Sequence, residues 1–185
     1  MKTRRFLIVV MFLFASAPLV WADDQAASGD WIKERAAQGD ANAQFYLGVM
    51  YDKGEGVPQD YAEATKWYHL AAAQGNTGAQ FNLGSMYQAG QGVPKDYAEA
   101  AKWYHQLAVQ GHAGAQFNLG VMYQAGQGVP QDYVQAYKWL NLAASNYAAG
   151  SNHDMAAKAR DTLETQMTPA QIAEAQKLAR EWKKQ

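Results

Sequence analysis

Ala79-Gln80-Phe81-Asn82-Leu83-Gly84-Ser85-Met86-Tyr87 occurs in this chain three times with few changes. Residues 43–51 read Ala-Gln-Phe-Tyr-Leu-Gly-Val-Met-Tyr, and residues 115–123 read Ala-Gln-Phe-Asn-Leu-Gly-Val-Met-Tyr, so each copy begins 36 positions after the one before. A sequence that returns at a constant interval of roughly 20 to 50 residues builds stacked copies of one structural unit. We therefore expect a repeat array in place of a single globular core.

This stretch has the apolar spacing of an α-helix, which we call helix A and expect over about residues 41–53 in the first copy. Ala43 and Leu47 are four residues apart, on one face of a helical period. Gly48 lies on that face. Since glycine inside a helix costs about 1 kcal/mol relative to alanine, we expect Gly48 to allow a close helix contact. Gly54 is typical of the left-handed residue that ends a helix.

A second helix, helix B, is expected to follow a short connector in each repeat. The connector Gly-x-Gly-Val-Pro stands at 54–58, 90–94 and 126–130. Asp60 can accept the free N–H groups of the first helical turn, and Glu63 three residues later predicts a capping box. The same positions hold Asp96 with Glu99 and Asp132 with Gln135. Helix B then carries Trp67, Trp103 and Trp139, which we expect to be core residues.

The pattern predicts an all-α fold, a right-handed α/α superhelix of helix-turn-helix repeats with capping helices. The three repeats are expected at 40–75, 76–111 and 112–147. Residues 23–39 contain a match to helix B and are expected to form an N-terminal capping half-repeat. Residues 148–185 depart from the pattern and are expected to form capping helices at about 152–166 and 169–182. Terminal units of a solenoid need such covers because the stacked core is otherwise exposed.

Residues 1–22 have the layout of a cleavable signal peptide. A basic start with Lys2, Arg4 and Arg5 precedes the apolar run 6–14, and small residues lead to Ala22. The alternative is an uncleaved membrane anchor, but the apolar run is short for a spanning helix. We therefore expect a periplasmic protein, or alternatively a secreted one, with no stable membrane span after signal cleavage.

Composition excludes several classes of function. Removal of the three basic residues of the signal would change the net charge from −1 to −4, which is a poor charge for binding nucleic acid. The chain has no Cys, so it has no disulfide, thiolate metal site or lipid-anchored cysteine. We expect a monomer that is stabilised by packing alone.

The pattern Ala-Gln-x-x-Leu-Gly-x-Met-Tyr, Gly-x-Gly-Val, Asp-x-x-x-Ala-x-x-Trp resembles the Sel-one-like repeat (SLR) family, which is related to tetratricopeptide repeats. The resemblance covers residues 31 to about 145. The segment 167–175 resembles the closing helix of exported bacterial members. The resemblance implies an α/α superhelix that serves as an adaptor for protein–protein contacts, in roles that include envelope assembly, signalling and host interaction.

The residues that could carry chemistry have simpler explanations. His69, His105, His112 and His153 are the four histidines. Equivalent residues of successive repeats are separated by about 10 Å per helix layer, so we expect surface histidines and no metal site. The aspartates at 60, 96 and 132 are explained by helix capping. The glycine connectors lack the lysine of a phosphate-binding loop. We expect no catalytic residue, no metal and no cofactor.

Relation to tetratricopeptide repeats implies which helix A residues line a concave groove. The predicted groove residues are Asn42, Phe45, Val49 and Asp52 in the first repeat, Phe81, Ser85 and Gln88 in the second, and Phe117, Val121 and Gln124 in the third. A row of phenylalanines flanked by amides could hold an amphipathic helix or an extended peptide. The alternative is that each phenylalanine packs between neighbouring copies of helix A.

The sequence thus predicts a non-catalytic scaffold or adaptor of the bacterial envelope that binds a protein or peptide in a concave helical groove. One alternative is a secreted effector or adhesin that contacts a host protein. Another is a β-lactam or cell-wall hydrolase, because cysteine-rich members of the family have been linked to penicillin binding and β-lactam hydrolysis. The lack of Cys removes the feature of that branch. The identity of the partner does not follow from the sequence.

Overall fold

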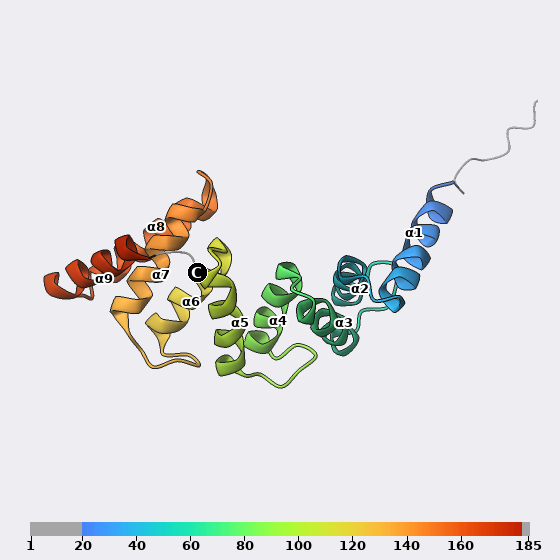
Figure 1. Cartoon of the computed structure of the whole chain (residues 1–185), viewed down its shortest axis with the longest axis horizontal. Helices are drawn as coiled ribbons and strands as arrows, with labels where there is room; N and C mark the ends of the chain where they lie inside the picture. Colours follow the sequence, from blue (N-terminus) through green and yellow to red (C-terminus); the bar gives the residue numbers. More distant parts are fainter. Residues whose placement is uncertain (1–19, 183–185) are drawn as a thin grey trace, which may run out of the picture.

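The computed structural model describes residues 20–182, with side chains from Gly29 onward. This part of the chain folds into nine α-helices and no strand, and the helices are stacked in chain order along one curved row (Figure 1). The helices are α1 (Val20–Ala37), α2 (Ala41–Lys53), α3 (Tyr61–Ala73), α4 (Thr77–Ala89), α5 (Tyr97–Val109), α6 (Ala113–Ala125), α7 (Tyr133–Asn146), α8 (Ser151–Glu164) and α9 (Pro169–Glu181). The predicted all-α solenoid of helical hairpins is confirmed.

The helices alternate as the repeat predicts. Helix A is α2, α4 and α6, and helix B is α3, α5 and α7. The match to helix B near the N-terminus forms the last part of α1, a longer helix that begins at Val20. Most of the predicted signal peptide, residues 1–19, lies outside the described residues, so this segment stays a prediction. No helix in the range 20–182 is long and apolar enough to cross a membrane.

Each helix A ends where glycine allows a left-handed residue. Gly54 has φ of 74° and its N–H donates to the carbonyl of Met50, and Gly90 and Gly126 repeat this arrangement. At the other end of helix A, the N-cap side chains of Asp40 and Asn76 accept the N–H three residues later. Local sequence therefore sets both ends of these helices.

Helix B is capped by aspartate alone. The Asp60 carboxylate accepts the N–H groups of Ala62 and Glu63 at 2.9 and 3.0 Å. The predicted reciprocal bond from Glu63 to the backbone of Asp60 is not made, because the Asp60 N–H already donates to the carbonyl of Tyr51 at 2.8 Å. The Glu63 carboxylate forms an ion pair with Lys66 instead. Glu99 and Lys102 pair in the same way. The capping-box prediction was wrong here, since the backbone N–H that the glutamate would accept is bonded to the end of the preceding helix A, as it also is at Asp96 and Asp132. The predicted hydrogen bonds from the first turn of helix B to the aspartate carboxylate are confirmed.

Within each hairpin the glycine of helix A makes room for a large side chain of helix B. A Cβ added to Gly48 would lie 2.6 Å from the ring of Tyr68, and one added to Gly84 would lie 2.7 Å from Tyr104. Both tyrosines are buried. The close contact predicted from the repeated glycine is therefore confirmed.

Successive hairpins are joined by buried glutamines. The side-chain amides of Gln44, Gln80 and Gln116 donate to the carbonyls of Ala36, Ala72 and Ala108, at 3.2, 3.3 and 3.0 Å. Each acceptor is in the last turn of the preceding helix B, where carbonyls have no partner within their own helix. The glutamine of the repeated motif thus ties each helix A to the helix before it.

The tryptophans of helix B are buried to different extents, although all three were predicted to be core residues. Trp139 is 1% exposed, but Trp67 and Trp103 are only partly buried and lie against the edges of their clusters. The difference comes from the C-terminal cap, because Trp182 covers Trp139 with ring centroids 4.8 Å apart. The prediction that all three are core residues was wrong for the first two, which no such cap covers.

The C-terminal cap closes the stack as two further helices. Thr168 and Gln171 form the reciprocal capping box that starts α9. Ala175 and Ala179 are buried on its inner side. Lys138 of α7 lies over the rings of Trp139 and Trp182, at 4.2 and 5.2 Å. The cap therefore combines apolar contact with a cation–π pair.

His112 gives the third helix A a pH-sensitive start. Its Nδ1 accepts the N–H of Ala115 at 3.2 Å, in the place of the Asp40 and Asn76 oxygens. Packing against Phe81, with ring centroids 5.1 Å apart, removes water from the imidazole and lowers the pKa of His112 below its ordinary value of 6.5. A protonated imidazole cannot accept this bond.

We expect stability to fall as the pH drops below about 6.5, because the unfolded chain then binds a proton that the folded His112 resists. His112→Asn should retain the cap and reduce this loss. The measurement is the melting temperature of both proteins at pH 7.5 and 5.0. Equal losses in the two proteins would contradict a role for His112.

Candidate peptide-binding face

Neighbouring copies of helix A and neighbouring copies of helix B contact each other through side chains of different size. Phe45 of α2 lies directly against Gly78 of α4, where an added Cβ would be 2.9 Å from the ring. On the other side, neighbouring copies of helix B are kept apart by larger groups, since His69 packs on Trp103 with ring centroids 6.0 Å apart. His105 and Trp139 repeat that spacing. We call the exposed side of the three helix A copies, α2, α4 and α6, the helix A face.

The structure places the ten predicted groove residues along α2, α4 and α6. Asn42 and Ser85 are exposed. The other eight are partly exposed: Phe45, Val49, Asp52, Phe81, Gln88, Phe117, Val121 and Gln124. Their assignment to a binding groove stays a prediction. Tyr46, which is 56% exposed and was not among the predicted residues, belongs to the same face by its position on α2.

The phenylalanines pack between repeats and keep part of each ring exposed. Phe45 contacts Gly78 and approaches the ring of Tyr68, with centroids 6.0 Å apart. Phe81 does the same with Gly114 and Tyr104. Phe117 packs against the clusters of α7 and α8. The interpretation that the rings pack between copies of helix A therefore holds for Phe45 and Phe81, whereas Phe117 packs on α7 and α8. A partner could contact the remaining exposed edge of each ring.

Buried tyrosines hold the polar groups of this face. The Tyr68 hydroxyl donates to Asp52 at 3.4 Å, and burial raises the pKa of Tyr68, with the Asp52 charge adding to the rise and a bond with Asn82 opposing it. The Tyr104 hydroxyl donates to Gln88 at 3.2 Å, and burial raises the pKa of Tyr104 to about 12. Both hydroxyls therefore stay protonated at neutral pH and orient the side chains above them.

The third repeat presents a more apolar surface. Leu140 stands where the first two repeats have Tyr68 and Tyr104, so Gln124 has no tyrosine beneath it. Val121 replaces Ser85 at the next position. The helix A face therefore changes along the array, from an acidic group at Asp52 to amides and then to a neutral, partly apolar end.

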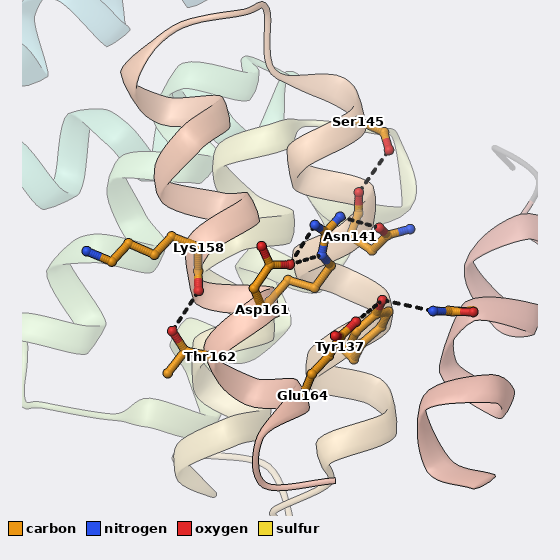
Figure 2. A network of polar contacts seen from close by, with 9 residues as sticks. Tyr137, Asn141, Ser145, Lys158, Asp161, Thr162 and Glu164 are labelled. Carbon is orange, nitrogen blue, oxygen red and sulfur yellow. Dashed lines mark hydrogen bonds and ion pairs between the residues drawn. The ribbon is translucent and has the colours of Figure 1, made fainter. Parts of the chain in front are cut away.

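A polar network fixes the cap beside this end of the face (Figure 2). The Tyr137 hydroxyl donates to Glu164 at 2.8 Å and accepts from Gln176 at 3.4 Å, which joins α7 to α8 and α9. Arg160 donates to Asn141 at 3.0 Å and forms an ion pair with Asp161. The cap is thus held to the third repeat by hydrogen bonds as well as by packing.

Sequence reasoning missed two of these features. Gln44, Gln80 and Gln116 were seen only as part of a motif, and the hydroxyls of Tyr68 and Tyr104 were treated as packing groups. The return of both residue types at an interval of 36 was the available signal. Within residues 29–182 no group of three His, Asp or Glu side chains is placed to hold a metal ion.

Two solved structures are similar to this chain. A Sel1 repeat protein from Oxalobacter formigenes is 39% identical, with a TM-score of 0.59 over 72% of this chain and 95% of that one. A protective antigen of uropathogenic Escherichia coli strains, which displays an SLR fold, is 31% identical, with a TM-score of 0.62 over 84% of this chain. The match covers 40% of that antigen, so this chain spans less than half of its length. No curated protein matches the chain.

A family model gives the same result from sequence. The Sel1 repeat model matches residues 41–76, 77–112 and 113–147, which together make up more than half of the chain. Each matched segment contains one helix A and one helix B of the structure. Proteins of this kind are generally non-catalytic scaffolds for protein–protein interaction. The chain belongs to the Sel1 repeat family.

Proposed function

We propose that this protein is a non-catalytic adaptor of the bacterial envelope that holds a protein or peptide on the helix A face. The observation that carries the proposal is the order of its polar groups. Asp52 and Gln88 are held in place by hydroxyls of buried tyrosines, beside the exposed edges of Phe45 and Phe81. Groups that are already oriented lose little conformational entropy when a partner binds.

The mixture of groups suits a peptide. Amides and hydroxyls can bond to a peptide backbone, and the phenylalanine edges offer apolar contact to its side chains. Ser85 is exposed at the middle of the face, and Val121 marks its apolar end. The partner proposed here is an extended or helical segment that is apolar at one end of its contact.

The location is the periplasm in this proposal, and it depends on the predicted signal peptide of residues 1–22. The alternative is secretion as an effector or adhesin that contacts a host protein. The likeness to a protective antigen of uropathogenic Escherichia coli favours keeping that alternative. Fractionation of cells separates the two, because a periplasmic pool without release into the medium would contradict secretion.

Photocrosslinking in living cells tests the binding face. A photoreactive amino acid at Ser85 should give a discrete crosslinked product, because this position is exposed at the centre of the helix A face. The matched control is the same amino acid at Lys66 of α3, which is also exposed but belongs to helix B. We expect products from the first position and none of the same mass from the second. Equal products from both, or none from Ser85, would overturn the proposal.

A further inference from the structure

A hollow of about 570 Å³ lies on α5, away from the ten residues of the helix A face. Its walls come from α5, from Leu119 and Tyr123 of α6, and from Gly128 and Val129 of the connector that follows α6. Cavities that bind ligands commonly enclose roughly 300–1,000 Å³. The volume is therefore large enough for a bulky side chain of a partner.

At the position that lines the hollow, the second repeat has a smaller side chain than the first. In the first repeat Thr65 reaches the next connector, and a Cβ added to Gly92 would lie 2.6 Å from its Oγ1. The equivalent residue of the second repeat is Ala101. A Cβ added to Gly128 would meet only the backbone of Tyr97 and Ala98 as its three nearest atoms. Ala101 lacks the methyl and hydroxyl groups with which Thr65 approaches its connector, which leaves more room between α5 and the connector at Gly128.

A second contact of the first repeat is also absent from the second repeat. The Tyr87 hydroxyl is 3.3 Å from Nε2 of His69, so the two side chains are joined across the surface. Their equivalents, Tyr123 and His105, both line the hollow, and no hydrogen bond joins them. Neither of these two contacts of the first repeat therefore recurs at the junction that carries the hollow.

The hollow has an apolar floor and basic residues at its rim. Ala101 and Leu119 are buried at the floor. At the rim stand Lys102 and His105, and no acidic residue lines the hollow. The Lys102 ammonium pairs with Glu99 at 2.7 Å, but its side chain is 73% exposed, and an ammonium has two further N–H groups to donate.

We propose that this hollow is a second binding site, which takes a bulky apolar side chain from a partner peptide whose adjacent residue is a carboxylate. The apolar side chain would cover Ala101 and Leu119. The carboxylate would accept from Lys102 at the rim. This site is separate from the helix A face, so the protein could hold two segments of one partner, or two partners, at once.

Short peptides of defined sequence test the site. The probe is acetyl-Gly-Trp-Asp-Gly-amide, added to isotope-labelled protein while the amide signals of Ala101 and Gly128 are followed by NMR. One buried aromatic side chain supports a Kd on the order of 1 mM. The same peptide with Lys in place of Asp should bind about threefold more weakly, since an exposed ion pair contributes little. The version with Ala in place of Trp should bind at least about tenfold more weakly.

Variants of the protein supply the controls. Ala101→Thr gives this position the residue of the first repeat and should weaken binding at least about fivefold, because its larger side chain occupies part of the floor on which the apolar side chain packs. Ala101→Val, which is similar in size, should act alike. Lys102→Glu should reverse the preference between the Asp and Lys peptides. Unchanged affinity in both Ala101 variants, or no signal change at 10 mM peptide (about ten times the expected Kd), would overturn the proposal.

Two further outcomes separate this site from others. Trp31 is 59% exposed beside Asp30, so a second copy of the chain carries the same chemistry. A different outcome is that the protein self-associates and that both Trp31→Ala and Ala101→Thr abolish this association. This result would show that the hollow takes a second copy of the chain, and it would overturn the proposal of a partner peptide. If no crosslink formed at Ser85 but the peptide still bound in the hollow, the proposed function of the helix A face would be contradicted and the second site would stand.

Discussion

Replacing Gly92 with alanine is expected to lower the free energy of unfolding by about 3 kcal/mol. Gly92 has φ of 71°, which costs a residue with a Cβ about 1 kcal/mol. In addition, the new Cβ would lie 2.1 Å from the carbonyl oxygen of Tyr61. Because that atom belongs to the backbone at the start of α3, neither partner can move by a change of rotamer. The connector and helix would have to separate.

Gly75→Ala is the matched control for this prediction. Gly75 also has a positive φ, of 85°, but an added Cβ would have nothing within 4 Å. It should cost only the backbone term of about 1 kcal/mol. Urea unfolding of both variants, followed by circular dichroism, gives the two differences. If the variants lost the same stability, close packing of the connector against the preceding hairpin would not be the reason for the glycine at 92.

Replacing Gln116 with leucine is expected to cost about 2 kcal/mol, since two hydrogen bonds of a buried amide are lost at about 1 kcal/mol each. Its Nε2 donates to the carbonyl of Ala108 at 3.0 Å, and its Oε1 accepts from Asn146 at 2.8 Å. The side chain is fully buried, so water does not replace these bonds. They hold α6 against the ends of both α5 and α7.

Gln80→Leu should cost far less, although it is the same change at the equivalent position. Gln80 makes the bond to Ala72 at 3.3 Å, but its buried Oε1 has no hydrogen-bond partner among residues 29–182. Leucine removes that unpaired atom as well as the bond, so the two effects nearly cancel. Thermal and urea unfolding of both variants measure the difference. A Gln80 variant as unstable as the Gln116 variant would show that the buried volume, and not the bonding, sets the cost.

The repeat determined most of the fold in advance because its signals act over short distances along the chain. Gly54 can end a helix and Asp60 can begin one through backbone groups within four residues of each, so the prediction needed no tertiary contact. Gly48 likewise predicted a close helix contact from local sequence. Its cost inside a helix is local, and its return at 84 and 120 implied a compensating neighbour.

The sequence predicted which residues belong to the candidate site, but it did not predict the contacts that these residues make. Helix period and the family resemblance placed Phe45 and Asp52 on one side of helix A. They did not indicate that Phe45 would rest on Gly78, or that the Tyr68 hydroxyl would reach Asp52 from below. These contacts join different helices, and their geometry depends on how closely each hairpin approaches the next.

Identical residues of the repeat acquire different surroundings once the hairpins are stacked. Trp139 is buried because Trp182 covers it, whereas Trp103, at the equivalent position of the preceding repeat, remains partly exposed. The hollow beside Ala101 likewise depends on a connector nearly 30 residues further along, at Gly128. Local sequence was enough for the helices, their ends and the repeat. Burial, the surface polar groups and the second cavity were settled only by packing, since each needs atoms that are distant in the chain and meet only in the folded stack.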